Sequence, residues 1–288
     1  MQLPLALLVI LFVLIIGLIP FFLLYPLSDV VRWMLFKVFK YRRTVVEQNL
    51  EETFPKLSKT EIRELSWKFY RNLSDVLVEG IKAFTMTKEQ IRSRHKVLNP
   101  EVALPYYEKN RSIIGVPSHY GNWEWGSMSG ALQLPQKYVV FYKPLQNKWI
   151  DKYTRWSRSK YRGNLVSIYE TRKIFEDHQA NNSIFIMASD QSPSNESKSL
   201  WVNFLGRDTA FLHGPEHYAK KYDLPVIFVD IQRVRRGFYH LTLKLITDKP
   251  LETGEGEITR EYAKLLEKAI YAKPENWLWS HRRWKLSR

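Results

Sequence analysis

Near its start the chain has a run of 25 residues, Leu3 to Leu27, without a single charged side chain. About 20 apolar residues suffice to cross a bilayer as a helix, so the run predicts an N-terminal transmembrane helix within residues 1–27. Pro20 and Pro26 are expected to kink or break its C-terminal end, which leaves Leu5 to Ile19 as the firm part. A cleaved signal peptide would need a basic start and a small-residue cleavage site, and neither is present.

Basic and aromatic residues alternate over the next segment, residues 28–43. Basic residues on this flank of a membrane span place the rest of the chain on the cytoplasmic side. Aromatic rings and cations together also suit a segment that lies on an anionic membrane surface. The alternative is an ordinary solvated helix with an apolar underside. The residues are Arg32, Lys37, Lys40, Arg42 and Arg43 among Trp33, Phe36, Phe39 and Tyr41.

The formal net charge is +15 over 288 residues. Such an excess predicts an acidic partner, and nucleic acid, anionic lipid, a phosphorylated substrate and an acidic protein would each satisfy it. The absence of cysteine excludes disulfides, thiolate catalysis and cysteine-based metal sites. No Walker loop, G-x-S-x-G elbow or H-E-x-x-H zinc helix occurs, and we expect no metal.

From residue 44 onward the pattern predicts one α/β domain, residues 44–288. A capping box at Ser58 and Glu61 starts a long amphipathic helix. Apolar runs then alternate with helical or polar stretches, which predicts a mixed β-sheet flanked by helices. The last two runs bracket a basic turn at residues 235–237 and are expected to form an antiparallel hairpin at the sheet edge. The runs are Ile113–Val116, Tyr138–Tyr142, Leu165–Ile168, Ile184–Met187, Val226–Ile231 and His240–Ile246.

The stretch P-S-H-Y-G-N-W-E-W follows the first of these runs. Asn122 is expected to cap a helix that starts at Trp123, so His119 would lie in the tight turn between strand and helix. The first helical turn can then aim Glu124 back at the imidazole, where a carboxylate fixes the tautomer and supports the imidazolium. His119 is therefore a candidate general base, with a hydrogen-bonded structural histidine as the alternative.

Other polar residues stand where α/β sheets bind ligands. Asp190 follows a predicted strand, although an ordinary turn aspartate is an equal alternative. Cations after the Tyr138 strand, together with Arg207, are candidates for binding phosphate, and a solvated basic face is the alternative. These cations are Lys143, Arg155, Arg158, Lys160 and Arg162. The C-terminal segment Pro274 to Lys285 places three tryptophans among basic residues, which suits either a membrane interface or closure of the core.

These motifs together resemble the lysophospholipid acyltransferase superfamily, and within it the bacterial lipid A late acyltransferases, the lauroyl and myristoyl transferases. The resemblance covers nearly the whole chain. It includes Y-R-R-T-V-V-E-Q-N-L, H-Y-G-N-W-E, D-Q, F-L-G-R, G-P-E-H-Y-A and the closing P-E-N-W-L-W-S-H-R-R-W-K. After D-Q the family commonly has glycine or another acidic residue, where this chain has Ser192-Pro193-Ser194, and this departure leaves the acceptor lipid open.

The resemblance implies an O-acyltransferase without a cofactor, with His119 as general base and Glu124 as its partner. The fatty acyl chain would pass from an acyl carrier protein thioester, or acyl-CoA, to a hydroxyl of a lipid A precursor. The family implies a single-pass protein of the inner membrane with its catalytic domain on the cytoplasmic side. Its partners would be acyl carrier protein, a membrane lipid acceptor and an anionic membrane surface. Candidates for substrate contacts are Asn122, Lys143, Arg158, Arg162, Asp190, Gln191 and Arg207, with the choice between Arg158 and Arg162 left open.

Two alternatives to this function remain at the level of sequence. A lysophospholipid or aminolipid acyltransferase of the same superfamily would share the histidine turn and differ in its acceptor. A membrane-tethered basic module without catalysis, binding nucleic acid or acyl carrier protein, would explain the net charge of +15. We expect no nucleic-acid partner, because a binding module offers no reason for the histidine turn.

Overall fold

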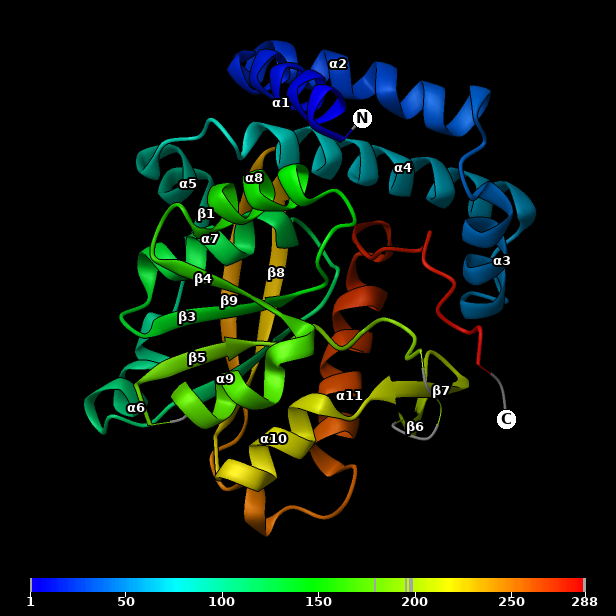
Figure 1. Cartoon of the computed structure of the whole chain (residues 1–288). Helices are drawn as coiled ribbons and strands as arrows, with labels where there is room; N and C mark the ends of the chain where they lie inside the picture. The colour runs from blue at the N-terminus through cyan, green and yellow to red at the C-terminus, as the bar shows by residue number, and fades with distance from the viewer. Residues whose placement is uncertain (1, 179, 195, 197–198, 287–288) are drawn as a thin grey trace.

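Figure 1 shows the chain in a computed structural model, which describes residues 2–178, 180–194, 196 and 199–286. Two N-terminal helices lie along the long helix α4, and a sheet with helices packed around it forms the centre (Figure 1). The C-terminal segment runs between α11 and α3. The chain thus forms an α/β fold, as the sequence predicts.

Within the described residues the main sheet has seven strands, in the order β1, β9, β8, β2, β5, β3 and β4. Strands β8 and β9 pair antiparallel, and the other neighbours pair parallel, so the sheet is mixed. The strands are β1 (His95–Val97), β2 (Ile113–Pro117), β3 (Lys137–Tyr142), β4 (Gly163–Ser167), β5 (Ser183–Ile186), β8 (Val226–Arg235) and β9 (Phe238–Thr247).

All six apolar runs of the sequence become strands of this sheet. The predicted hairpin is confirmed, but β1 pairs with β9 on its outer side, so the hairpin is not at the edge. A separate antiparallel pair, β6 (Ser199–Phe204) and β7 (Arg207–Leu212), was not predicted. β1 has a single apolar residue, and the apolar runs of β6 and β7 are only three residues long, which is too short to predict a strand.

Helices cover both faces of the sheet and complete two apolar cores. The neighbouring strand residues Ile113 and Ile114 enter different cores, as expected when successive side chains point to opposite faces. The capping box of α4 is confirmed, because Glu61 N donates to Ser58 Oγ and Ser58 N donates to Glu61 Oε2. The helices after residue 42 are α3 (Arg43–Thr53), α4 (Lys59–Lys82), α5 (Lys88–Arg94), α6 (Leu104–Glu108), α7 (Trp123–Gln133), α8 (Lys148–Ser159), α9 (Thr171–His178), α10 (Gly214–Tyr222) and α11 (Glu257–Ala272).

The N-terminal apolar run forms two helices, α1 (Gln2–Leu18) and α2 (Phe21–Trp33). In the part of the chain that the structure describes, no helix combines the length and the apolar character that crossing a membrane requires. The single transmembrane helix predicted within residues 1–27 is therefore not shown, and the single-pass arrangement stays a prediction. Pro20 lies between the two helices and divides the apolar run, so that α1 ends after 17 residues.

The break between α1 and α2 is stabilised by a side chain at the end of α4 and by one in the turn after it. Lys82 Nζ donates to the carbonyl of Gly17 at 2.5 Å and to that of Ile19 at 2.9 Å, and Thr85 also binds the Gly17 carbonyl. Carbonyls that a helix end leaves without partners are thereby satisfied. Both helices keep an uncovered apolar face, which includes Leu8, Leu11, Phe12, Ile15, Leu18 and Phe22.

Residues 28–43 divide between the interior and the surface. Phe36 is buried, and the Arg42 guanidinium donates to the carbonyl of Ser280 at 3.0 Å. Trp33 and Phe39 are exposed. Phe36 thus packs inside the fold while Arg42 stays exposed, and the interfacial role of residues 28–43 stays a prediction.

Candidate active site

The turn after β2 carries His119 between strand and helix, as the sequence predicts. Asn122 caps α7, because its Oδ1 accepts a hydrogen bond from Trp125 N at 2.9 Å. Gly121 has a φ of +62°, and a Cβ at this position would lie 2.6 Å from the carbonyl oxygen of Ile231. Only glycine fits such a turn without strain. We call residues 117–122 the histidine turn.

A carboxylate from a neighbouring strand holds the imidazole of His119. Asp190 follows β5, which pairs parallel with β2, so the two strand ends meet at one edge of the sheet. His119 Nδ1 lies 2.8 Å from Asp190 Oδ1, and the backbone N–H of His119 donates to Asp190 Oδ2 at 2.8 Å. The indole Nε1 of Trp277 donates to the same Oδ2 at 3.0 Å. Since a buried carboxylate accepts at Nδ1, the imidazole carries its proton there and presents Nε2 as a lone pair.

Gln191 and the C-terminal segment complete the surroundings of this imidazole. The amide nitrogen of Gln191 lies 3.2 Å from His119 Nε2 and donates to it. The carbonyl of His119 accepts from Leu278 N at 3.1 Å, and Gly121 N donates to the carbonyl of Asn276 at 3.0 Å. The turn is therefore fixed both by its own helix cap and by a segment about 155 residues further along the chain.

The two groups shift each other's titration. Burial disfavours a charged His119, but the charge and hydrogen bond of Asp190, with a smaller contribution from the Glu124 charge, outweigh it and raise the pKa of His119. Burial likewise opposes ionisation of Asp190, yet the charge and hydrogen bonds of His119 and the bond from Trp277 hold the pKa of that carboxyl below its usual value. Such a pair suits a base that becomes an imidazolium during a reaction.

Glu124 takes a different position from the one predicted. Its carboxylate forms an ion pair with Arg158 of α8. Among the described residues the hydrogen-bonded carboxylate of His119 is Asp190, so Asp190 and not Glu124 fixes the tautomer. The physical reason is the direction of α7, on which Glu124 points across to α8. Only its longer-range charge still acts on the imidazole.

A cavity of about 650 Å³ opens beside His119. Its polar lining includes Glu124, Lys143, Arg158 and Gln191. Its apolar lining comes largely from successive strands of the sheet and includes Val140, Leu165, Ile186, Val229, Ile231 and Leu241. Cations and an apolar chamber thus converge on one imidazole, which suits a ligand with an anionic group and a long apolar tail.

The remaining candidate residues lie outside this lining. Arg162 is exposed and donates to the carbonyl of Pro135 at 3.5 Å. Arg207 pairs with Glu52 and stacks on the ring of Trp284 at 3.3 Å, and burial lowers its pKa to about 10. Of the two arginines that the sequence left open, Arg158 is therefore the one beside His119. Over the described residues, no group of three or more potential metal-ligating side chains comes together.

The family model described as "Bacterial lipid A biosynthesis acyltransferase" matches residues 2–286, nearly the whole chain. The chain belongs to this family. It is an acyltransferase of lipid A biosynthesis.

Curated relatives carry the same description. The acyltransferase is 23% identical over 269 residues to the lipid A biosynthesis lauroyltransferase of Escherichia coli (strain K12). The aligned residues cover 92% of this chain and 86% of that relative. It is 23% identical over 248 residues to the lipid A biosynthesis palmitoleoyltransferase of the same strain, with 85% of this chain and 79% of the relative covered. A lipid A biosynthesis acyltransferase of Shigella flexneri matches to the same extent.

Sequence reasoning about this acyltransferase missed two contacts of the site. The pairing of His119 with Asp190 spans 71 residues, and its sequence signals are that both residues follow strands and that each belongs to a motif of the family resemblance. The role of Trp277 has a weaker signal, which is its place in the closing motif P-E-N-W. His281 in the same motif accepts from Ser192 N at 3.0 Å, and burial lowers its pKa to about 4.

Proposed function

We propose that this acyltransferase moves a fatty acyl chain from an acyl carrier protein thioester to a hydroxyl of a lipid A precursor, with His119 as the general base. The observation that carries the proposal is the imidazole held by Asp190 at 2.8 Å on the rim of a largely apolar cavity. An acyl chain needs an apolar chamber, and a hydroxyl nucleophile needs a base within hydrogen-bond reach.

In the proposed reaction the acceptor hydroxyl takes the place of the Gln191 amide at His119 Nε2. Nε2 removes the hydroxyl proton while the oxygen bonds to the thioester carbonyl carbon. The imidazolium then gives that proton to the sulfur as the carbon–sulfur bond breaks. An ester and a free thiol result, and no acyl-enzyme forms. Asp190 stabilises the imidazolium throughout, because its carboxylate binds Nδ1.

The ion pair of Glu124 and Arg158 supports the proposal at the mouth of the cavity. Glu124 retains a role as the second acidic group near His119, but it acts through its charge and through the position of Arg158. Arg158 and Lys143 present two cations where an anionic headgroup or the phosphate of a carrier-protein arm would lie.

We propose further that the protein binds the inner membrane through the apolar face of α1 and α2. Leu18 and Phe22 are 72% and 73% exposed, and an uncovered apolar surface of this kind marks an interaction site. The net charge of +15 supports both an anionic lipid surface and an acidic carrier protein as partners.

The test is acyl transfer by membranes that contain the His119→Ala protein, measured with acyl carrier protein thioester and a tetra- or penta-acylated lipid A precursor. We expect a loss of about 100-fold or more, as for removal of a general base. His240→Ala, a partly buried histidine on β9 outside the cavity lining, is the control and should keep its activity. Undiminished transfer by His119→Ala would exclude the proposed base.

The same assay distinguishes the acceptors and donors. Transfer to a lysophospholipid or an aminolipid, with none to the lipid A precursor, would contradict the proposed acceptor. Equal rates with acyl-CoA and acyl carrier protein thioester would contradict the proposed donor preference. Mass spectrometry of total lipids from a deletion strain identifies the missing acyl group and its carrier.

A further inference from the structure

One buried carboxylate, Glu79 of α4, lies outside the cavity lining and contacts the histidine turn. Its side chain is 0% exposed. Asn122 Nδ2 donates to Glu79 Oε2 at 2.6 Å, Tyr239 OH donates to the same oxygen at 2.7 Å, and Tyr25 OH donates to Oε1 at 3.0 Å. All three donors are uncharged. Burial of a carboxylate without a charged partner costs desolvation free energy, so a functional reason for its position is expected.

Asn122 connects this carboxylate to the reacting imidazole. Its Oδ1 accepts from Trp125 N and caps α7, while its Nδ2 donates to Glu79. The two bonds together leave the Asn122 side chain one orientation. Because Asn122 is only three residues after His119, that orientation also sets the path of the histidine turn.

Glu79 also holds the start of α7 through its main chain, because its carbonyl accepts from the indole Nε1 of Trp125 at 2.8 Å. On its other side it binds Tyr25 of α2, the helix that carries part of the exposed apolar face. Burial is the main cause that raises the pKa of Glu79 to about 7, which shows how far this carboxylate is removed from water.

We propose that Glu79 is a positioning residue for acyl transfer: by binding Asn122 it fixes the histidine turn, and by binding Tyr25 it ties that turn to α2. The inference rests on the proposed function of His119 as general base. A misplacement of a catalytic group by about 1 Å can lower a rate by about 100-fold, so loss of this contact should lower kcat.

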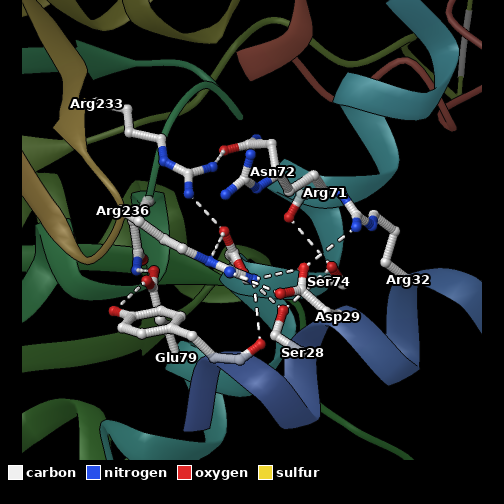
Figure 2. A network of polar contacts seen from close by, with 12 residues as sticks. Ser28, Asp29, Arg32, Arg71, Asn72, Ser74, Glu79, Arg233 and Arg236 are labelled. Carbon is white, nitrogen blue, oxygen red and sulfur yellow. Dashed lines mark hydrogen bonds and ion pairs between the residues drawn. The ribbon is translucent and has the colours of Figure 1, made fainter. Parts of the chain in front are cut away.

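The same helix offers a matched control one turn earlier. Asp75 is also 0% exposed, and it binds Ser28, Arg233 and Arg236. Figure 2 shows these contacts together with Glu79, and in it the labelled Arg236 reaches Asp29 of α2. The contacts of Asp75 join α2, α4 and the β8–β9 hairpin, and α7 has no part in them. A purely structural role of buried carboxylates would affect both positions alike.

The experiment compares kcat, KM and thermal stability for Glu79→Met, Glu79→Gln and Asp75→Asn in the full-length protein, at a temperature where all three are folded. For Glu79→Met we expect kcat to fall about 30-fold while KM changes less than about threefold. Glu79→Gln should recover kcat to within about fivefold of the wild type, because its amide oxygen still accepts from Asn122 and its amide group donates to Tyr25. Asp75→Asn should lower the melting temperature at least as much and keep kcat within about threefold.

Asn122→Ser gives a second measurement if Glu79→Met does not fold. Serine still caps α7 but has no amide to donate to Glu79. We expect a loss of kcat similar to that of Glu79→Met, and in the double variant no further loss beyond the larger single one, because both changes break one contact. Additive losses, or equal kcat losses in Glu79→Met and Asp75→Asn, would overturn the inference.

The His119→Ala variant distinguishes a failure of the positioning role of Glu79 from a failure of the proposed function. If His119→Ala retains transfer, the proposed base is wrong, whatever the Glu79 variants do. If His119→Ala abolishes transfer while Glu79→Met keeps the kcat of the wild type, only the positioning role is wrong.

Discussion

The two ends of the chain are both rich in large apolar side chains and have opposite positions in the fold. The N-terminal helices α1 and α2 and the C-terminal segment, residues 274–286, are both rich in large apolar side chains with basic residues nearby. The first exposes its apolar side chains, with Leu8 66% exposed. The second buries them, with Trp277 and Trp279 at 2% and 0%.

Hydrogen bonding explains the difference. The indole of Trp277 donates to Asp190, and that of Trp279 donates to the carbonyl of Pro274 at 2.6 Å, so the polar atom of each buried ring has a partner. Asn49 of α3 satisfies the carbonyl of Trp279 at 2.9 Å. The side chains of α1 are purely aliphatic or Phe over most of its length and have no polar atom that would fix them at one place inside. A high apolar content therefore shows only that exposure of a segment to water is unfavourable. The hydrogen bonds of its polar atoms decide whether the segment is buried inside the protein.

The strongest test of this comparison is Trp277→Ala. Truncation of a buried tryptophan should lower the free energy of unfolding by about 3–5 kcal/mol and leave Asp190 Oδ2 with one donor fewer. Denaturant unfolding and acyl transfer should both show the loss. Trp277→Phe, which keeps most of the ring but not the N–H, is the control and should lose about 1–2 kcal/mol. Wild-type stability of Trp277→Ala would mean that the segment does not close the core.

The opposite result is expected at the N-terminal end. Replacing Leu8, Leu11 and Ile15 together by serine removes three exposed aliphatic side chains from one face of α1. Binding to anionic phospholipid vesicles, measured by sedimentation, should weaken about 100-fold, while the free energy of unfolding changes by less than about 1 kcal/mol. Leu24→Ser, at a buried position of α2, is the control that lowers stability. Unchanged vesicle binding by the triple variant would contradict a membrane role for this face.

The pH dependence of kcat should depend on the C-terminal region and not on α1. Trp277 of the C-terminal segment contacts Asp190, which forms the titrating pair with His119. His119 must be neutral to act as a base, and Asp190 raises its pKa, so kcat should fall as the pH decreases through that raised value. Asp190→Asn removes the charge that raises it, so the acid limb should move to lower pH while kcat also falls. The triple variant in α1 should keep the wild-type profile. A profile unaffected by Asp190→Asn would contradict the pairing.

The smallest expected effect comes from Tyr25→Phe, which tests the contact of the N-terminal helix α2 with Glu79. It removes one hydrogen bond, that of Tyr25 to Glu79, and leaves the ring in place. We expect about 1 kcal/mol of lost stability and about a threefold lower kcat, measured in the same assay. A loss as large as that of Glu79→Met would mean that α2, rather than Asn122, carries the effect of Glu79.

Local sequence patterns determined much of the fold. The six apolar runs, the capping box of α4 and the histidine turn all depend on neighbouring residues, and each formed where it was expected. The break at Pro20 is local as well, because the ring of proline removes a helical hydrogen bond wherever it stands. The sequence signal for β1, β6 and β7 was weak, since each has an apolar run of three residues or fewer.

The partners of the site were decided by tertiary structure. Asp190 reaches His119 only because β5 lies next to β2. The sequences of the two strands do not predict that they are neighbours in the sheet. Glu124 turns to Arg158 because α8 packs beside α7, and Asn122 meets Glu79 because α4 crosses the start of α7. The sequence alone indicated the candidate residues of the site and the apolar segments of the chain. Contacts between residues far apart in the chain decided which carboxylate serves the imidazole and which apolar end is buried, because those choices depend on packing partners that no local pattern encodes.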